Sequence, residues 1–182
     1  MALTESSMVA LGMPCPDFEL PGVDGRTWRR DDFRESCLLV VIMCNHCPYV
    51  QAVDDRINDL AKDYSGRCAV VGINPNDARA YPEDSFEAMQ VRARIKGYRF
   101  PYLRDESQAV ARAFGAVCTP DHFLFDASRV LAYRGRLDDN WKDAEAVTRR
   151  ELREALDALL SENPVPFPQR PSLGCSIKWK ES

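Results

Sequence analysis

Apolar residues in the first half of the chain alternate between unbroken runs and a helical spacing. Residues 38–43 and 68–73 are continuous apolar runs, which is typical of strands buried on both faces of a sheet. Between them, apolar residues recur in steps of three and four after Cys47, at Val50, Val53, Ile57, Leu60, Ala61 and Tyr64. This order predicts two parallel strands joined by a right-handed crossover helix that ends at Ser65-Gly66.

Capping and stop residues predict three further helices. Asp84 is the expected N-cap of a helix over residues 84–96, which Gly97 ends. Ser107 is the expected N-cap of a short helix that follows it. A last helix is expected over residues 143–160, because its apolar residues share one face and its charged residues form a solvated one.

Two hairpins complete the predicted elements. Residues 18–20 and 26–28 flank a glycine-rich turn, and residues 122–125 and 130–133 flank a second turn. The late hairpin adds antiparallel strands to the early parallel pair. The sequence therefore predicts an α/β fold in which helices cover both faces of a mixed central sheet, with an added N-terminal β-hairpin.

We expect one domain over residues 1–182, since no linker, repeat or low-complexity block interrupts the chain. Its core spans about residues 14–160. Residues 1–13 show little periodicity and are expected to form a loose arm. The proline-rich segment that starts at residue 163 cannot continue a helix, so residues 163–182 are expected to form an extended tail along the surface.

Composition and charge narrow the classes of function. The net charge of −4 and the sequence pI of about 5.3 indicate neither a nucleic-acid-binding nor an anionic-membrane surface. The N-terminus has no basic segment followed by a long apolar one, and the longest apolar run is too short to span a bilayer. A cytoplasmic location is the expectation.

The chain has seven cysteines, an odd number, so they cannot all pair within one chain. In a reducing compartment most of them are expected to be thiols, and cysteine serves well as a small buried apolar residue. Cys37 and Cys68 border the two apolar strands and are expected to fill the core, whereas Cys15 lies incidentally between two prolines. Cys44, Cys47, Cys118 and Cys175 remain as candidates for chemistry.

Cys44-Asn45-His46-Cys47 lies between the first apolar strand and the crossover helix. At a helix N-terminus, unpaired backbone N–H groups and the helix dipole stabilise a thiolate, which is the nucleophilic form of cysteine. This placement predicts redox chemistry, and a protonated His46 would lower the pKa of a neighbouring thiol. A structural zinc ion needs four ligands, and no second Cys-x-x-Cys or His-x-x-x-His motif is present, so we expect no metal.

Three segments carry a resemblance to a known family. They are Pro14-Cys15-Pro16-Asp17-Phe18-Glu19-Leu20, the Cys-x-x-Cys motif after the first central strand, and Thr119-Pro120 before the closing hairpin. Together they resemble the thioredoxin fold, and within it the alkyl hydroperoxide reductase/thiol-specific antioxidant family, which is peroxiredoxin-like. The tail segment 171–180 is similar to the ending of a bacterial subgroup of this hybrid type.

The resemblance implies a thioredoxin-like three-layer sandwich and a cis Pro120 packed against the cysteine pair, with Thr119 and His46 in supporting roles. It also implies thiol–disulfide exchange without a metal or organic cofactor. The expected partners are a thiol reductant or a disulfide substrate, with peroxide as a further candidate, and neither nucleic acid nor a membrane. The oligomeric state stays open.

The chain departs from the peroxiredoxin pattern P-x-x-x-T-x-x-C. Aligned on Cys47, the proline is replaced by Val40 and the threonine by Cys44. Analogy with thioredoxin favours Cys44 as the attacking thiol, with Cys47 resolving the mixed disulfide. Pro48 favours Cys47 as the N-cap instead, because proline is best tolerated at the first helical position. Both cysteines are kept as catalytic, with Cys44 preferred for disulfide exchange.

Four residues outside the motif are also considered, and two of them have alternative interpretations. Cys118 precedes Thr119-Pro120 and is either a third redox thiol or a small buried residue. Cys175 is either a resolving thiol, within the chain or across a dimer, or simply part of a docked tail. His122 is expected to be a core or edge histidine, and Asp121 a surface residue.

The main functional hypothesis is a thiol–disulfide oxidoreductase with an antioxidant or redox-homeostasis role that uses Cys44 and Cys47. The first alternative is a thiol peroxidase in which Cys47 attacks the peroxide and Cys44 captures the resulting sulfenic acid. The second is a redox-inactive thioredoxin-like binding module.

Overall fold

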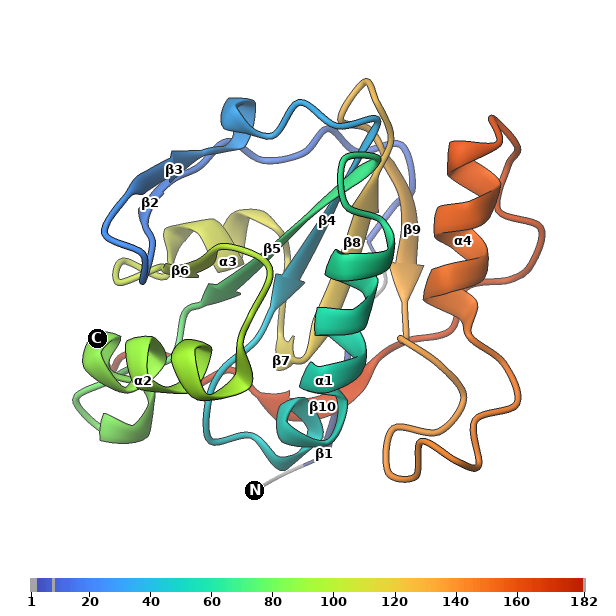
Figure 1. Ribbon diagram of the computed structural model, residues 1–182. Helices are drawn as coiled ribbons and strands as arrows, with labels where there is room; N and C mark the ends of the chain where they lie inside the picture. The colour runs from blue at the N-terminus through green and yellow to red at the C-terminus, as the bar shows by residue number, and fades with distance from the viewer. Residues whose placement is uncertain (1–2, 8, 182) are drawn as a thin grey trace.

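The computed structural model describes residues 3–7 and 9–181. Its centre is a five-stranded sheet in the order β6-β5-β4-β8-β9, in which β4, β5 and β6 are parallel and β8 and β9 are antiparallel (Figure 1). The strands of this sheet are β4 Cys37–Ile42, β5 Cys68–Asn74, β6 Tyr102–Arg104, β8 Asp121–Phe125 and β9 Leu131–Gly135. The predicted mixed sheet, including the late hairpin, is confirmed.

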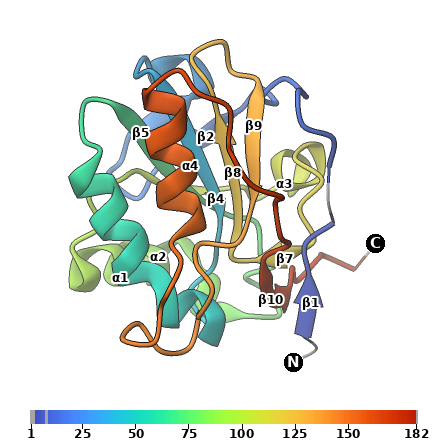
Figure 2. The same ribbon diagram turned by 90° about the vertical axis from the view of Figure 1, so that its right-hand side faces the viewer.

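Helices cover both faces of the sheet, as the sequence predicts. They are α1 Pro48–Asp63, α2 Phe86–Lys96, α3 Ala109–Ala113 and α4 Glu151–Leu160, with 3-10 turns at Arg30–Asp32 and Pro82–Asp84. Figure 2 shows α1 and α4 side by side on one face, with α3 behind the sheet. Within the described part of the chain, no helix combines the length and apolar character needed to cross a bilayer.

The burial of β4 explains the layering. All six of its residues are buried, and successive side chains of a strand point to opposite faces. Leu39 and Val41 therefore pack with α1 and α4, whereas Leu38 and Val40 pack with α3 and the N-terminal hairpin. That hairpin is formed by β2 Glu19–Pro21 and β3 Thr27–Arg29, where it was predicted.

The chain ends form a second, small sheet that the sequence did not predict. β1 Leu3–Glu5 pairs with β10 Leu173–Ser176, which in turn pairs with β7 Cys118–Thr119. The expectation of a loose N-terminal arm was wrong for residues 3–5. Residues 1, 2, 8 and 182 lie outside the described residues, so the expectation there stays untested.

Three predicted helix boundaries were wrong. The last helix begins at Glu151 rather than at residue 143, because the side chains of Asp139 and Asn140 accept hydrogen bonds from the backbone N–H groups of the preceding loop. The second helix begins after Ser85, whose Oγ accepts from Ala88 N at 3.2 Å, so Asp84 is not its N-cap. The short helix begins after Gln108 rather than at Ser107.

Candidate functional site

The two cysteines of the motif meet at the junction between β4 and α1. Cys47 is the N-cap of α1 and Pro48 occupies its first turn, as the position of the proline predicts. The Val50 N–H in the first turn is one of the groups that lower the Cys47 pKa, which is the effect expected at the positive end of a helix. Cys44 lies in the loop just before, and both side chains are completely buried.

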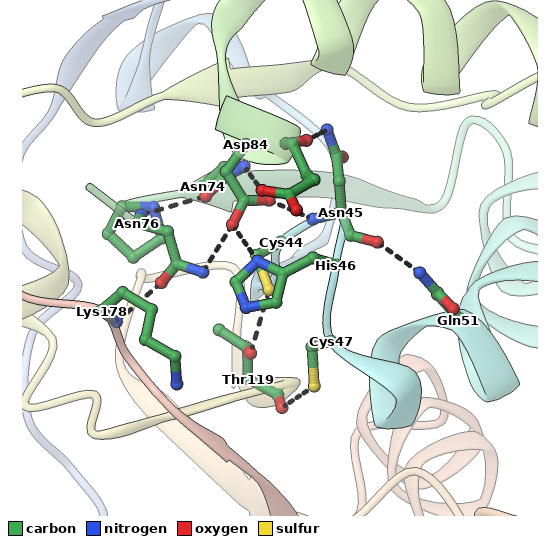
Figure 3. A network of polar contacts seen from close by, with 12 residues as sticks. Cys44, Asn45, His46, Cys47, Gln51, Asn74, Asn76, Asp84, Thr119 and Lys178 are labelled. Carbon is green, nitrogen blue, oxygen red and sulfur yellow. Dashed lines mark hydrogen bonds and ion pairs between the residues drawn. The ribbon is translucent and has the colours of Figure 1, made fainter. Parts of the chain in front are cut away.

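One residue from a distant part of the chain contacts both sulfurs. Cys44 Sγ lies 3.3 Å from Thr119 Oγ1, and the protonated Cys47 thiol donates to the Thr119 carbonyl oxygen at 3.1 Å (Figure 3). The peptide bond from Thr119 to Pro120 is cis, which was the expectation for this position. The structure therefore brings together Cys44, Cys47, Thr119 and Pro120.

The pKa values of the two thiols are shifted in opposite directions. The hydrogen bond from the Cys44 thiol lowers the pKa of Cys47 to about 5, with smaller contributions from the Cys175 thiol and the Val50 N–H. Burial raises the pKa of Cys44 well above its ordinary value of 9.0, and the hydrogen bond to Cys47 and the nearby Asp84 charge act in the same direction. The directions of these shifts make Cys47 the more acidic thiol of the pair.

His46 points away from the sulfur of Cys47 and toward a carboxylate. Its Nδ1 lies 2.6 Å from Asp84 Oδ2 (Figure 3). Its ring stacks on Tyr81 with centroids 5.0 Å apart. The same carboxylate accepts hydrogen bonds from Asn45 N at 2.6 Å and from Asn76 Nδ2 at 2.8 Å. Asp84 thus fixes both residues between the cysteines.

Sequence reasoning missed Asp84 as part of this site. A signal was present, because the carboxyl ends of adjacent parallel strands meet at one edge of a sheet. Asn74 ends β5, whose parallel neighbour β4 leads into Cys44, so the polar segment after Asn74 had to lie beside the motif.

The C-terminal strand covers the cysteine pair. Cys175 on β10 is the register partner of Thr119 and is 1 % exposed. In this segment of the expected tail the chain is a strand that is built into the molecule rather than lying along its surface. Cys118 is also fully buried next to the site. Burial raises its pKa above the ordinary thiol value.

Asp121 and His122 follow Pro120 into the core. Asp121 was expected at the surface, which was wrong: it is fully buried and forms a two-point ion pair with Arg134, the shorter contact being 2.6 Å. His122 is buried as expected, and burial lowers its pKa to about 4. Its Nδ1 lies 3.2 Å from the Gly135 carbonyl oxygen.

A small cavity of about 60 Å³ lies beside Pro120 and His122. Val53, Leu137, Trp141 and Leu173 supply its apolar wall. His122 Nε2 is buried without a hydrogen-bond partner among the described residues. The cavity therefore offers a small apolar space next to the loop that contacts both cysteines.

One group in residues 3–7 and 9–181 has the ligand types for a metal ion. A Cys44 sulfur, a His46 ring nitrogen and an Asp84 oxygen lie within 4.8 Å of one another. Both Asp84 oxygens already accept hydrogen bonds from the protein, which leaves this group better suited to positioning than to coordination. The expectation of a site without metal or organic cofactor stays a prediction.

Comparison with known proteins gives the chain a consistent set of relatives. The model of the AhpC/TSA family matches residues 11–134. The thiol-disulfide oxidoreductase ResA of Geobacillus thermodenitrificans is 26% identical over 124 residues, which cover 68% of this chain and 67% of ResA.

Two solved structures match nearly the whole chain, and a third shares the fold over most of it. A crystal structure of an uncharacterized conserved protein from Geobacillus kaustophilus is 47% identical with a TM-score of 0.95, covering 100% of this chain and 98% of that one. A hypothetical protein from Sinorhizobium meliloti is 43% identical with a TM-score of 0.94, covering 98% and 100%. Peroxidoxin BcpB from Mycobacterium tuberculosis, at 20% identity and a TM-score of 0.62, shares the fold over 83% of this chain and 96% of its own.

Proposed function

Since the chain belongs to the AhpC/TSA family and has a thiol-based redox function, we propose that it is a thiol–disulfide oxidoreductase whose redox pair is Cys44 and Cys47. The observation that carries the proposal is the convergence of both sulfurs on Thr119, with Cys47 at the N-cap of α1. The name of the ResA relative supports the same reaction type.

In the proposed reaction, the Cys47 thiolate attacks one sulfur of a substrate disulfide. The substrate S–S bond breaks, a Cys47–substrate disulfide forms, and the first substrate thiolate leaves. Cys44 then loses its proton and attacks the Cys47 sulfur, which forms the Cys44–Cys47 disulfide and releases the second substrate thiolate. Two electrons have moved from the protein to the substrate, and a thiol reductant reverses the steps.

This order of attack differs from the preference that thioredoxin analogy gave to Cys44. The difference in acidity supports Cys47 as the nucleophile, because the thiolate is the reactive form. His46 and Asp84 act as positioning residues that hold the loop between the two sulfurs. We assign the reaction to redox homeostasis in a reducing compartment such as the cytoplasm, where most thiols are kept reduced.

The test compares wild type with Cys44→Ser, Cys47→Ser and the control Cys15→Ser. Cys15 is a buried thiol whose pKa burial raises to about 12, so it should not react. The reduced proteins are mixed with oxidised glutathione, and the products are mapped by mass spectrometry. We expect Cys47→Ser to react at least about 100-fold more slowly than wild type, and Cys44→Ser to accumulate a mixed disulfide at Cys47.

Wild type that never forms a Cys44–Cys47 disulfide with oxidised glutathione would contradict the proposal and leave the thiol peroxidase and the binding module as the surviving hypotheses. A Cys15→Ser protein that reacts like wild type establishes that the slower reaction of Cys47→Ser results from changing the motif, not from removing any buried thiol.

A thiol peroxidase is the second candidate, favoured by the low pKa of Cys47. In that reaction the Cys47 thiolate attacks hydrogen peroxide, the O–O bond breaks, and Cys47 sulfenic acid and hydroxide form. The Cys44 thiol then displaces water to give the same disulfide. Peroxide consumption that survives in Cys44→Ser and is lost in Cys47→Ser supports this candidate, and its absence in both eliminates it.

A further inference from the structure

A third thiol, that of Cys175, lies next to Cys47. The Cys175 side chain hydrogen bonds to the Cys47 sulfur, just as Cys44 does. Cys175 is paired in register with Thr119, whose carbonyl oxygen lies 3.1 Å from Cys47 Sγ. Cys47 therefore interacts with two neighbouring thiols, those of Cys44 and Cys175.

The strand that carries Cys175 is fixed in place on both edges. β10 pairs with β1 on one side and with β7 on the other. Gly174 approaches the Thr119 backbone so closely that an added Cβ would lie 2.0 Å from the Thr119 carbonyl oxygen. The position of Cys175 next to Cys47 is therefore a consequence of sheet pairing and close packing, not of a mobile tail.

Cys118 does not have the same relationship to Cys47. Residues directly opposite each other on paired strands share one face, and neighbouring residues on a strand face opposite ways. Cys175 is opposite Thr119, whereas Cys118 precedes Thr119 and is opposite Ser176. The Cys118 sulfur instead lies 3.9 Å from the Pro120 carbonyl oxygen.

We propose that Cys175 is a third redox thiol of this site, which competes with Cys44 for the Cys47 sulfur and forms a Cys47–Cys175 disulfide within one chain. This inference rests on the proposed exchange at Cys47 and adds a second resolving route to it. The disulfide would tie β10 covalently to the N-terminus of α1, over the site that β10 covers.

The step balances without an added oxidant. Starting from the Cys44–Cys47 disulfide, a Cys175 thiolate attacks the Cys47 sulfur, the Cys44–Cys47 bond breaks, and the Cys47–Cys175 bond forms. Cys44 leaves as a thiolate and takes up the proton that Cys175 released, since burial keeps the Cys44 pKa high. The number of thiols and disulfides in the chain is unchanged.

The experiment removes one competing thiol at a time. Reduced wild type, Cys44→Ser, Cys175→Ser and Cys44→Ser/Cys118→Ser are oxidised with diamide, a diazene that accepts two electrons and two protons from a pair of thiols. Unreduced peptides are then mapped by mass spectrometry, and a non-reducing gel separates monomer from dimer. Cys44→Ala is a second variant for the case that the serine protein does not fold.

We expect Cys44→Ser to form the Cys47–Cys175 disulfide as a monomer, in at least about tenfold excess over any other disulfide of Cys47, with or without Cys118. Three outcomes would each overturn the inference. They are Cys47 and Cys175 that both stay reduced after diamide, a Cys47–Cys118 disulfide, and a disulfide-linked dimer. Cys175→Ser reports separately on the proposed function: it forms Cys44–Cys47 if that pair is redox-active, whatever the fate of Cys175.

Discussion

His46 Nδ1 and Asp84 Oδ2 lie 2.6 Å apart, although 38 residues separate them in the sequence. Asp84 is completely buried, and backbone and side-chain N–H groups of Asn45 and Asn76 also point at its carboxylate. A buried carboxylate is tolerated only when its oxygens are satisfied in this way. The Cys-x-x-Cys loop is therefore anchored to the segment after β5 rather than to its own helix alone.

Asp84→Asn should lower the free energy of unfolding by about 1–3 kcal/mol, because an amide NH₂ would face N–H donors that now meet an oxygen. Chemical denaturation at neutral pH measures this loss. Asp55→Asn is the matched control, since Asp55 is an exposed partner of Lys96 and its loss should cost at most about 1 kcal/mol. An Asp84→Asn protein as stable as wild type would contradict the anchoring role.

The low pKa of Cys47 should depend on a donor at position 44. Cys44→Ala removes the thiol that contributes most to the lowered pKa, so the Cys47 pKa should rise from about 5 toward its ordinary value. Cys44→Ser keeps an O–H donor and should retain a lower pKa than the alanine variant. The ultraviolet absorbance of the thiolate, followed against pH, gives both values. Equal pKa values in the two variants would show that another group acidifies Cys47.

Gly174→Ala should weaken the pairing of β10 with β7 and so expose the cysteine pair that β10 covers. The new Cβ would clash with the Thr119 backbone, so β10 must move away from β7. Labelling of Cys44 and Cys47 by a thiol reagent, mapped by peptide, should become at least about tenfold faster than in wild type, because opening is easier. Ser176→Ala, on the same strand, should label at the wild-type rate. Unchanged labelling in Gly174→Ala would mean that β10 does not control access.

His122 should make the protein less stable as the pH falls from about 6.5 to 4. In this window the unfolded chain protonates the histidine, whose ordinary pKa is 6.5, while burial holds the folded pKa at about 4. The unfolded state then binds more protons, so stability is lost with falling pH, by up to about 3 kcal/mol for this group. Above pH 6.5 the group has no effect.

The measurement is the difference in unfolding free energy between wild type and His122→Asn at several pH values. Burial raises the pKa of the neighbouring Asp121 to about 6, which acts in the opposite direction, but Asp121 is present in both proteins and its contribution cancels. A difference that is constant from pH 7 to pH 4 would show that His122 binds its proton as readily in the folded state as in the unfolded chain.

The sequence predicted the helices and strands that depend on interactions between residues close together in the chain. The apolar spacing after Cys47 and the position of Pro48 were enough to place α1 and its N-cap, because helix faces and first-turn prolines follow from short-range geometry. The unbroken apolar run of β4 likewise predicted a strand buried on both faces.

Residues whose roles depend on distant partners were the ones misread. Asp84 and Asp121 have ordinary capping and turn positions in sequence. Their burial depends on partners far along the chain, which include His46 for Asp84 and Arg134 for Asp121. The side chains of Asp139 and Asn140 accept hydrogen bonds from backbone N–H groups of the following loop. This loop is therefore not helical, and α4 begins later than the apolar spacing predicts. Cys175 acquired its place through pairing between the two ends of the chain, for which the sequence contains no short-range signal.

The strand order β1-β10-β7 has a consequence for biosynthesis. A ribosome releases Cys44 and Cys47 early and β10 much later, so the nascent chain can fold around α1 while its thiol pair is still uncovered. Until β10 has been made and inserted between β1 and β7, oxidants and other thiols in the cell meet the pair directly. Among the described strands, β10 is made after all the others, and it separates the cysteine chemistry of the growing chain from that of the folded one.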